Sequence, residues 1–377
     1  MNPFFVAFFL VYAAVNSYIF VRCCQALEIT QSWRYLFAFA IVFASVAYIV
    51  AKIFSAKLHG SIYFILTWVG SFWFFVLLYV FLFLLLIDAV RILNAVFHFL
   101  PEILFKNYAL TKILLFAFVL LSILVLGIFG YIHRSSIKVK EINIEVNNRG
   151  KEYRILFFSD LHISVINNHK FLETLVDKVN RLEPDVVLIG GDIVDEKPEK
   201  LEEYGLTEKF KDLRAKFGIF AITGNHEYIN GAEKIIGFIE GNYNIKFLRD
   251  TSVLIDNSFY IVGREDRSSK VFSRRNRKNL AEILKDIPQN APKILLDHQP
   301  FNLDEATIFD FDLQLSGHTH NGQIFPLNLI TNLLYEVSWG YKRKGKTHIY
   351  VSSGVGTWGP PVKIGSDAEI VLIRFKI

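Results

Sequence analysis

The stretch Arg154-Ile-Leu-Phe-Phe-Ser-Asp-Leu-His162 decides the fold of the second half of this 377-residue chain. Its first five residues, Arg154–Phe158, are mostly apolar and are typical of a buried strand. After Ser159 come Asp160 and His162, whose side chains are of types that bind metal ions. Because one residue separates them, both can reach the same cation once the strand breaks into a loop. The stretch therefore predicts a strand that ends in a metal-binding loop.

The same arrangement returns four times further along the chain. Val186–Ile189 leads to Gly191-Asp192, Phe217–Ile222 to Gly224-Asn225-His226-Glu227, Ile294–Leu296 to His298, and Leu313–Leu315 to Gly317-His318-Thr319-His320. Between Arg154–Phe158 and Val186–Ile189, the segment Lys170–Leu182 has apolar residues at helical spacing. A helix between two strands indicates a layered α/β architecture. In such sheets ligands bind at the carboxyl ends of the strands, so we expect the five motifs to converge.

Further runs complete the expected fold. Ile137–Val146 alternates like a first strand, and later strands are expected at Ser258–Val262, His348–Val351 and Ile370–Ile377. Together the runs predict two sheets packed between helices.

The motifs carry the ligands of a two-metal site. Two divalent cations about 3.5–4 Å apart can clamp a phosphoryl group, lower the pKa of a bound water and neutralise the leaving oxygen. Such a site needs oxygen ligands, imidazoles and one carboxylate shared between the metals. Asp192 follows two glycines that allow close backbone approach, so it is the natural bridging ligand. Asn225 offers an amide oxygen, and His298, His318 and His320 offer imidazoles.

In this order the motifs D-x-H, G-D, G-N-H-E, H and G-H-x-H resemble those of the calcineurin-like metallophosphoesterase superfamily. The resemblance implies a β-sandwich flanked by helices and two divalent metal ions, which the ligand mixture allows to be manganese, iron or zinc. It assigns Asp160, His162, Asp192 and His320 to metal one, and Asp192, Asn225, His298 and His318 to metal two. It also implies that His226 binds no metal, contacts the scissile phosphate and protonates the leaving group, a role that suits imidazole near neutral pH.

The segment Tyr350–Gly365 is similar to a subgroup of membrane-associated bacterial phosphodiesterases. Some members of that subgroup cleave the pyrophosphate of UDP-2,3-diacylglucosamine, which makes a lipid-linked substrate one expectation. Asn321 departs from the subgroup, where Gly more often follows the last metal-binding His, and this departure concerns substrate fit. The resemblance covers nearly all of residues 150–377 and none of the first 133.

The first 133 residues have the composition of a membrane anchor. The whole chain is 52% hydrophobic, and its uncharged apolar stretches are Pro3–Val21, Tyr35–Ala51, Ser61–Ile87 and Ile113–Ile132. Each is about as long as a helix that crosses a hydrocarbon core of roughly 30 Å. Ile92–Lys106 is interrupted by polar residues and proline, so we expect a connecting or interfacial helix there. We therefore predict about four spanning helices over 1–133 and a metallophosphoesterase domain over 134–377.

Charge distribution bears on transport and on orientation. Transporters place ionisable groups inside their spans, and the four stretches contain none, which favours an anchor. With a cytoplasmic N-terminus, the inside segments carry Lys52, Lys57, Arg134, Lys138, Lys140, Arg149 and Lys151. The opposite orientation places Arg22, Arg34, Arg91, Lys106 and Lys112 inside. The positive-inside rule thus favours a cytoplasmic catalytic domain, which with the bacterial resemblance predicts an inner-membrane protein.

Residues 134–377 hold 34 basic and 33 acidic residues, so their net charge of about +1 does not favour nucleic-acid binding. Three functions stay open. The domain can hydrolyse a lipid-linked phosphoester, act as a phosphatase or phosphodiesterase on a soluble substrate, or serve as a non-catalytic scaffold or sensor with a structural metal site.

A few residues allow more than one interpretation. Asp195 and Glu227 each follow a ligand motif, and each can orient a neighbouring group or act as a solvated carboxylate or helix cap. The basic run Lys342–Lys346 is either a hairpin turn or an attraction for anionic groups. Cys23 and Cys24 can be lipidated or bind metal, or they can be small apolar residues at a helix end.

Overall fold

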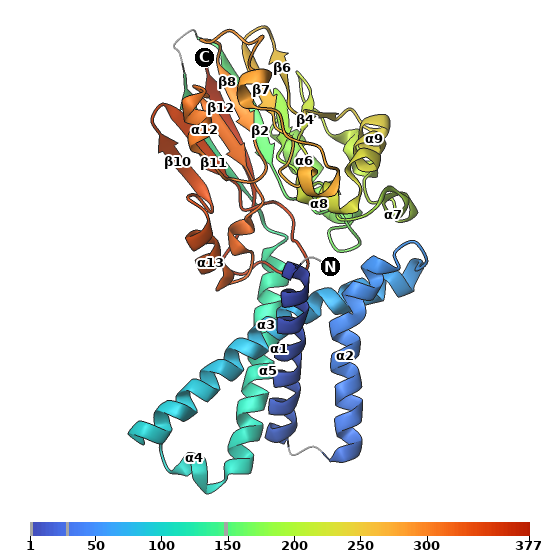
Figure 1. Ribbon diagram of the computed structural model, residues 1–377, viewed down its shortest axis with the longest axis vertical. Coiled ribbons are helices and arrows are strands. Elements are labelled where there is room, and N and C mark those ends of the chain that lie inside the picture. Colours follow the sequence, from blue (N-terminus) through green and yellow to red (C-terminus); the bar gives the residue numbers. More distant parts are fainter. Residues whose placement is uncertain (1–2, 28–29, 147–149) are drawn as a thin grey trace. The chain divides into compact units, whose positions relative to one another are not determined.

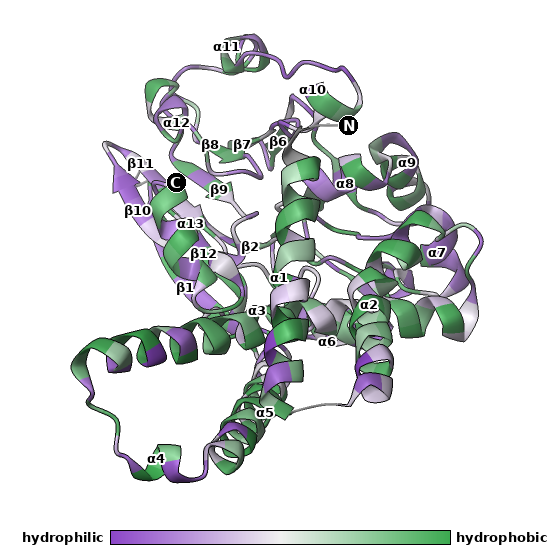
Figure 2. Ribbon diagram, turned by 60° about the horizontal axis from the view of Figure 1, so that its bottom comes forward, coloured by the Kyte–Doolittle hydropathy of each residue, from purple (hydrophilic) through white to green (hydrophobic). Residues whose placement is uncertain are grey.

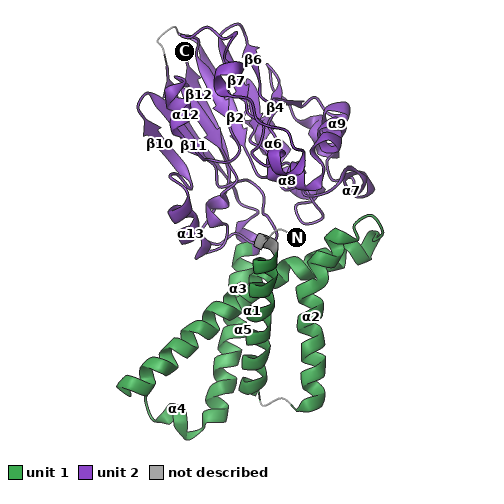
Figure 3. Ribbon diagram, viewed as in Figure 1, with its two compact units in different colours: residues 1–130 green, residues 131–377 purple. Residues whose placement is uncertain are grey.

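The structure, a computed structural model, describes residues 3–27, 30–146 and 150–377. The chain divides into two compact units, residues 1–130 and residues 131–377 (Figures 1 and 3). Arg149, one of the basic residues in the orientation argument, lies outside the described residues.

The first unit consists of apolar helices (Figure 2). The helices up to the domain boundary are α1 (Pro3–Leu27), α2 (Gln31–Ile53), α3 (Gly60–Phe97), α4 (Ile103–Lys106) and α5 (Tyr108–His133). Within the described residues, four of them are long and apolar enough to cross a membrane, which confirms the predicted number. Ile92–Lys106 forms no further span among the described residues, as expected, and α4 is a short connecting helix. The expected start of this segment is wrong, because residues 92–97 continue α3, which ends at Phe97 before Pro101.

Charged groups of this unit gather on Asp88 of α3, beyond the predicted apolar span. Its carboxylate accepts a hydrogen bond of 2.6 Å from the Tyr18 hydroxyl and pairs with Arg22, so α3 is joined to α1 by polar contacts. Cys23 and Cys24 lie within α1 as buried free thiols, and they form no disulfide.

The second unit contains two mixed six-stranded sheets (Figure 1). In spatial order the first sheet comprises β1 (Ile137–Glu145), β12 (Ala368–Lys376), β2 (Glu152–Phe158), β3 (Val186–Ile189), β4 (Ile219–Ala221) and β5 (Lys246–Phe247). The second comprises β10 (Gly340–Lys344), β11 (Thr347–Val351), β9 (Leu313–Ser316), β8 (Lys293–Leu296), β7 (Phe259–Gly263) and β6 (Thr251–Ile255). Strands β2 to β5 are parallel to one another, as are β7, β8, β9 and β11.

The sheets pack face to face and helices cover their outer faces. Phe157 and Ile373 of the first sheet share a buried cluster with Ile261 and Leu315 of the second. The outer face of the first sheet packs on α6 (His169–Arg181) and α9 (Ala232–Asn242), and that of the second packs on α11 (Leu280–Ile283) and α12 (Asp304–Ile308). The predicted β-sandwich flanked by helices is therefore confirmed.

The five motif-bearing runs all form strands, and their order in the sheets explains why they are so apolar. All four residues of Val186–Ile189 are fully buried, since parallel strands are covered on both faces. Parallel neighbours end at the same edge of a sheet, so the loops that follow β2, β3 and β4 adjoin, as do those that follow β8 and β9.

Candidate metal centre

The loops after these strands turn sharply at the predicted ligands. Positive φ angles occur at Asp160 (56°), His162 (47°), Asp192 (51°), His318 (72°) and His320 (50°). Such a conformation costs about 1–3 kcal/mol at each residue and persists only where the surroundings impose it. Here the loops impose it on one another, because the Asp160 and His162 amides donate to the carbonyls of Gly191 and Asp192, each at 3.0 Å.

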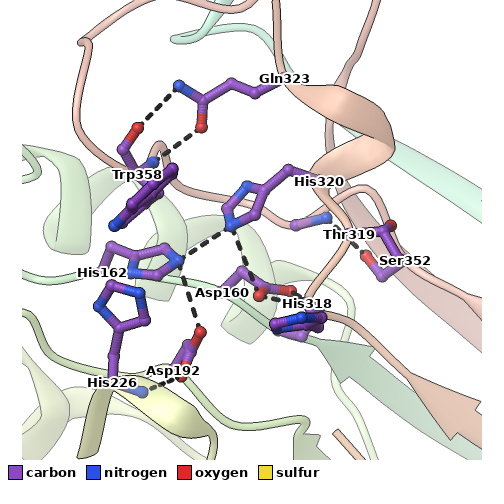
Figure 4. Close-up of polar contacts among 12 residues, drawn as sticks. Asp160, His162, Asp192, His226, His318, Thr319, His320, Gln323, Ser352 and Trp358 are labelled. Carbon is purple, nitrogen blue, oxygen red and sulfur yellow. Dashed lines mark hydrogen bonds and ion pairs between the residues drawn. The ribbon is translucent and has the colours of Figure 1, made fainter. Parts of the chain in front are cut away.

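One cluster joins Asp160, His162 and His320 (Figure 4). The Nδ1 atom of His162 is 2.7 Å from an Asp195 oxygen, so it carries the proton and Nε2 keeps its lone pair. That Nε2 lies 2.9 Å from Nε2 of His320, which is 3.5 Å from Oδ1 of Asp160. With metal–nitrogen bonds of about 2.0–2.1 Å, two nitrogens at right angles lie about 2.9 Å apart, so the three side chains fit a common cation.

A second cluster joins Asp192, His298 and His318. Nδ1 of His298 is 2.7 Å from the Gly190 carbonyl oxygen and donates to it. Its Nε2 is buried without a hydrogen-bond partner and lies 3.2 Å from Oδ2 of Asp192. The same oxygen is 3.9 Å from Nε2 of His162, so the Asp192 carboxylate faces both clusters.

Asn225 and two glycines complete this arrangement. Asn225 begins α8 (Asn225–Asn230), and its Oδ1 atom is also buried without a hydrogen-bond partner. A Cβ atom on Gly224 would lie 2.2 Å from Oδ1 of Asp192, and one on Gly317 would lie 2.3 Å from Oδ2 of Asp160. The glycines of the motifs are therefore required by the close approach of the carboxylates.

His226 forms a third group with His162 and Asp195, and it lies outside the two ligand sets assigned above (Figure 4). Its backbone N–H donates to Oδ1 of Asp192 at 2.8 Å, and its ring Nδ1 is 2.7 Å from Oδ1 of Asp195. The ring is 13% exposed and meets Trp358 edge to face at 6.0 Å. Burial lowers the pKa of His226, but Asp195 and Asp192 outweigh burial and raise it to about 9.

The structure decides between the interpretations left open for Asp195 and Glu227. One Asp195 oxygen accepts from both His162 and His226, and these partners hold its pKa far below the usual range despite burial. The fully buried Glu227 carboxylate accepts from the backbone N–H groups of Asp192, Ile193, Val194 and Gly224. Asp195 thus orients two imidazoles, and Glu227 caps α8 while it fixes the loop of Asp192.

Charges in the centre are strongly coupled. Burial opposes ionisation of Asp192, but His298 and His226 outweigh it and hold the pKa of Asp192 well below its usual range. Burial also opposes the His298 cation, yet the Asp192 carboxylate raises the pKa of that ring well above its usual range. By contrast, burial lowers the pKa of His318 to about 4. A bound cation must displace the proton of His298, so metal affinity should fall as pH falls.

Two supporting residues were missed in the sequence. Asn167 is buried and donates to the carbonyls of Leu161 and His162, each at 3.1 Å, while its oxygen is 3.3 Å from Arg134. Lys363 is fully buried and donates to three backbone carbonyls, those of Ser353, Gly354 and Asp367. A lone Asn carries no sequence signal, whereas the apolar and proline-rich surroundings of Lys363 are a signal that the sequence analysis did not use.

The comparisons with known proteins agree with this geometry. The family model described as calcineurin-like phosphoesterase matches residues 153–322, which contain every candidate ligand. An uncharacterized metallophosphoesterase of Campylobacter jejuni is 33% identical over 274 residues, which cover 72% of each chain. This chain belongs to the calcineurin-like phosphoesterases. The phosphoesterase is therefore a phosphoester hydrolase of a family that uses divalent metals, as the motifs implied.

Other relatives extend the similarity beyond bacteria. An uncharacterized metallophosphoesterase of Helicobacter pylori is 37% identical over 243 residues, which cover 63% of each chain. A Bos taurus protein, named as a transmembrane protein with metallophosphoesterase domain, is 32% identical over 230 residues, or 58% of this chain and 51% of that one. The phosphoesterase thus spans roughly half to three quarters of these relatives' lengths, and four apolar helices among its described residues indicate a membrane protein.

Proposed function

We propose that this phosphoesterase is a membrane-anchored, dinuclear enzyme that hydrolyses a phosphodiester or pyrophosphate bond. In this proposal residues 1–133 form the anchor and residues 134–377 form the catalytic domain. The observation that carries it is the position of the Asp192 carboxylate, which faces both clusters of candidate ligands at distances of 3.2 and 3.9 Å. A structural site has no need of a carboxylate shared between two open ligand sets.

The donor atoms suit two divalent cations. In the proposed assignment one ion is held by Asp160, His162, Asp192 and His320, and the other by Asp192, Asn225, His298 and His318. Bound manganese, iron or zinc would supply charge neutralisation at the phosphoryl group and a more acidic water. The Nε2 atom of His298 and the Oδ1 atom of Asn225 fit this occupancy, because each is a buried atom of a ligand type without a hydrogen-bond partner.

The chain itself supplies the proton of the leaving group. His226 is held through Nδ1 by Asp195, so its Nε2 atom is the ring position left for substrate. In the metal-free centre Asp195 and Asp192 raise the pKa of His226 to about 9, which favours the protonated ring at neutral pH. Asp195 keeps the ring in place and stabilises its cation, and water attacks the phosphorus directly without a covalent phosphoenzyme.

A lipid-linked substrate such as UDP-2,3-diacylglucosamine is the substrate class we favour. Only three residues, 134–136, separate the apolar helix α5 from β1. The first of them, Arg134, bonds to Asn167, which in turn bonds to the carbonyl of His162. The ligand loop is thus two hydrogen bonds from the end of α5, close to where that helix would leave a bilayer. By the charge argument this is the cytoplasmic side of a bacterial inner membrane.

The activity can be tested with full-length protein in lipid nanodiscs. Chelator-treated protein should regain hydrolysis of an aryl phosphodiester on addition of manganese. Asp192→Asn and His226→Ala should each lose most of the rate, whereas His169→Ala, an exposed histidine outside the centre, should keep it. Full activity in both site variants would show that the reaction occurs elsewhere.

The substrate class and the rival functions need separate measurements. Matched acylated and deacylated sugar nucleotides should differ in turnover, and equal rates would favour a soluble substrate instead. No metal-dependent turnover on a broad phosphoester panel, despite stoichiometric bound metal, would favour a scaffold or sensor. The near-neutral charge of residues 134–377 makes nucleic acid an unfavourable substrate.

A further inference from the structure

Helix α13 (Leu327–Leu334) is rich in apolar residues (Figure 2), and several of their side chains are exposed to solvent. The side chains of Leu329, Ile330, Leu333 and Leu334 are 54%, 52%, 88% and 67% exposed, and no residue of the helix is buried. At about 100° per residue, these four side chains fill an arc of about 140°, which we call the apolar face of α13. An exposed apolar face of this size on a folded domain marks an interaction surface.

The other side of α13 is fixed to the loop that carries two candidate ligands. The Ser338 hydroxyl donates to Thr331 at 2.8 Å, and the Thr319 hydroxyl donates to the Ser338 carbonyl at 2.5 Å. A Cβ atom on Gly322 would lie 2.2 Å from the backbone nitrogen of Asn328, so the start of the helix packs closely on this loop. The apolar face therefore cannot turn inward without breaking contacts of the metal centre.

Aromatic and basic side chains follow α13 in the chain. Trp339 and Tyr341 are 41% and 50% exposed, and the amine of Lys140 lies 5.7 Å from the Trp339 ring. Arg343 and Lys346 are exposed on the hairpin of β10 and β11. Exposed Trp and Tyr next to cations are typical of segments at a membrane surface with anionic headgroups.

The chain connection limits how far this surface can be from the membrane. His133 ends α5, and its ring is 3.0 Å from Asp367 of the domain. Lys140, which contacts Trp339, comes seven residues later, so it lies within about 25 Å of the end of that apolar helix. The apolar face of α13 lies in the same compact unit, residues 131–377, as His133 and Lys140.

We propose that α13 is an interfacial helix that lies in the bilayer surface, with its apolar face among acyl chains and the Arg343–Lys346 hairpin on anionic headgroups. The occupant of this face is lipid, held beside the membrane by the anchor. The contact would keep the loop of His318 and His320 at the membrane surface. It stands independently of the proposed activity, because it concerns binding and not turnover.

The test places a polarity-sensitive NBD fluorophore on cysteine variants of full-length protein in nanodiscs. The background is Cys23→Ser/Cys24→Ser, with labels at Leu333→Cys and Ile330→Cys on the apolar face. Asn332→Cys is the matched control, since it is exposed on the same helix but lies outside the arc. Doxyl-labelled phosphatidylglycerol in the nanodisc supplies the quencher.

Labels at 333 and 330 should show blue-shifted emission, and the doxyl lipid should quench most of their fluorescence. The fluorescence of the label at 332 should be quenched only a little. Equal, weak quenching at all three positions would overturn the proposal. Blue-shifted emission at 333 without lipid quenching would also overturn it, and would indicate cover by protein. Disulfide cross-linking of Leu333→Cys between chains would then identify a second copy as the occupant.

Discussion

Asp195→Asn is the most informative substitution in this phosphoesterase, because one oxygen of Asp195 holds both a proposed metal ligand and the proposed proton donor. Its Oδ1 lies 2.7 Å from the ring of His162 and 2.7 Å from the ring of His226. Asparagine keeps the size of the side chain and removes only its charge. We expect the variant to fold and to change two measurable properties.

The first property is the pKa of His226. In the metal-free centre the rise from 6.5 to about 9 corresponds to about 3 kcal/mol in favour of the protonated ring, and Asp195 is the largest of the groups that raise it. Because Asp195 raises this pKa, the ring keeps its proton above neutral pH, and bound cations, whose charge repels that of the ring, move the upper limit below pH 9. Without the Asp195 charge, burial still lowers the pKa, so we expect a fall of at least about 1 pH unit.

The second property is metal affinity. Loss of the group that orients a metal-binding histidine typically weakens binding by about 10–100-fold. His162 should therefore release its metal more readily in Asp195→Asn, and titration with manganese should detect the change. In a His226→Ala background the same loss of affinity should remain, because it does not pass through His226.

The assay is the pH profile of kcat at saturating manganese for two aryl phosphodiesters. With phenol as leaving group, the decline at high pH should begin at least about 1 pH unit lower in Asp195→Asn. With p-nitrophenol, which departs without a proton, the two profiles should nearly coincide. An unchanged phenol profile together with unchanged manganese affinity would refute the role given to Asp195.

Other predictions concern the backbone of the centre and its stability. Gly317→Ala should abolish tight metal binding, because its Cβ would lie 2.3 Å from Asp160; Gly237→Ala, which has open space around it, should bind manganese normally. Burial raises the pKa of Glu227 from 4.5 to about 7, so its ionisation disfavours the folded state between these pH values. In metal-free protein, the stability of the wild type relative to Glu227→Gln should therefore fall by about 3 kcal/mol from pH 4.5 to 7, as measured by denaturant unfolding. Chelation should lower the Tm and manganese should restore it; an unchanged Tm would argue against a bound cation.

Much of the fold follows from local sequence pattern. Val186–Ile189 forms β3 with the predicted bounds, because a run of β-branched residues that ends in two glycines has no competing structure. Short strands escaped the prediction, among them Lys246–Phe247, which pairs only at the edge of a sheet. Helix α13 was also missed. None of its residues is buried, so its apolar residues do not mark a face that packs on the core.

The roles of Asp195 and Glu227 show where local pattern ends. Both residues follow ligand motifs, yet an acidic residue at such a position can also be a helix cap or a solvated carboxylate. Glu227 is a cap and also accepts from the loop of Asp192, which is 35 residues away in the chain. Asn167 had no sequence signal, because it bonds both to the carbonyl of His162 nearby in the chain and to the carbonyl of Thr357, which is 190 residues away.

The sequence by itself determined the family, the strand ends that carry Asp160, Asp192 and His318, and the apolar anchor, because these depend on residue type and on short-range periodicity. Tertiary structure alone decided which nitrogen faces which carboxylate. Asp192 turns to both ligand clusters only because β2, β3 and β8 end at neighbouring places and their loops adopt left-handed backbone. Tertiary structure also decided that the apolar face of α13 lies outside the core, because the hydrogen bonds of Ser338 hold the opposite side of that helix.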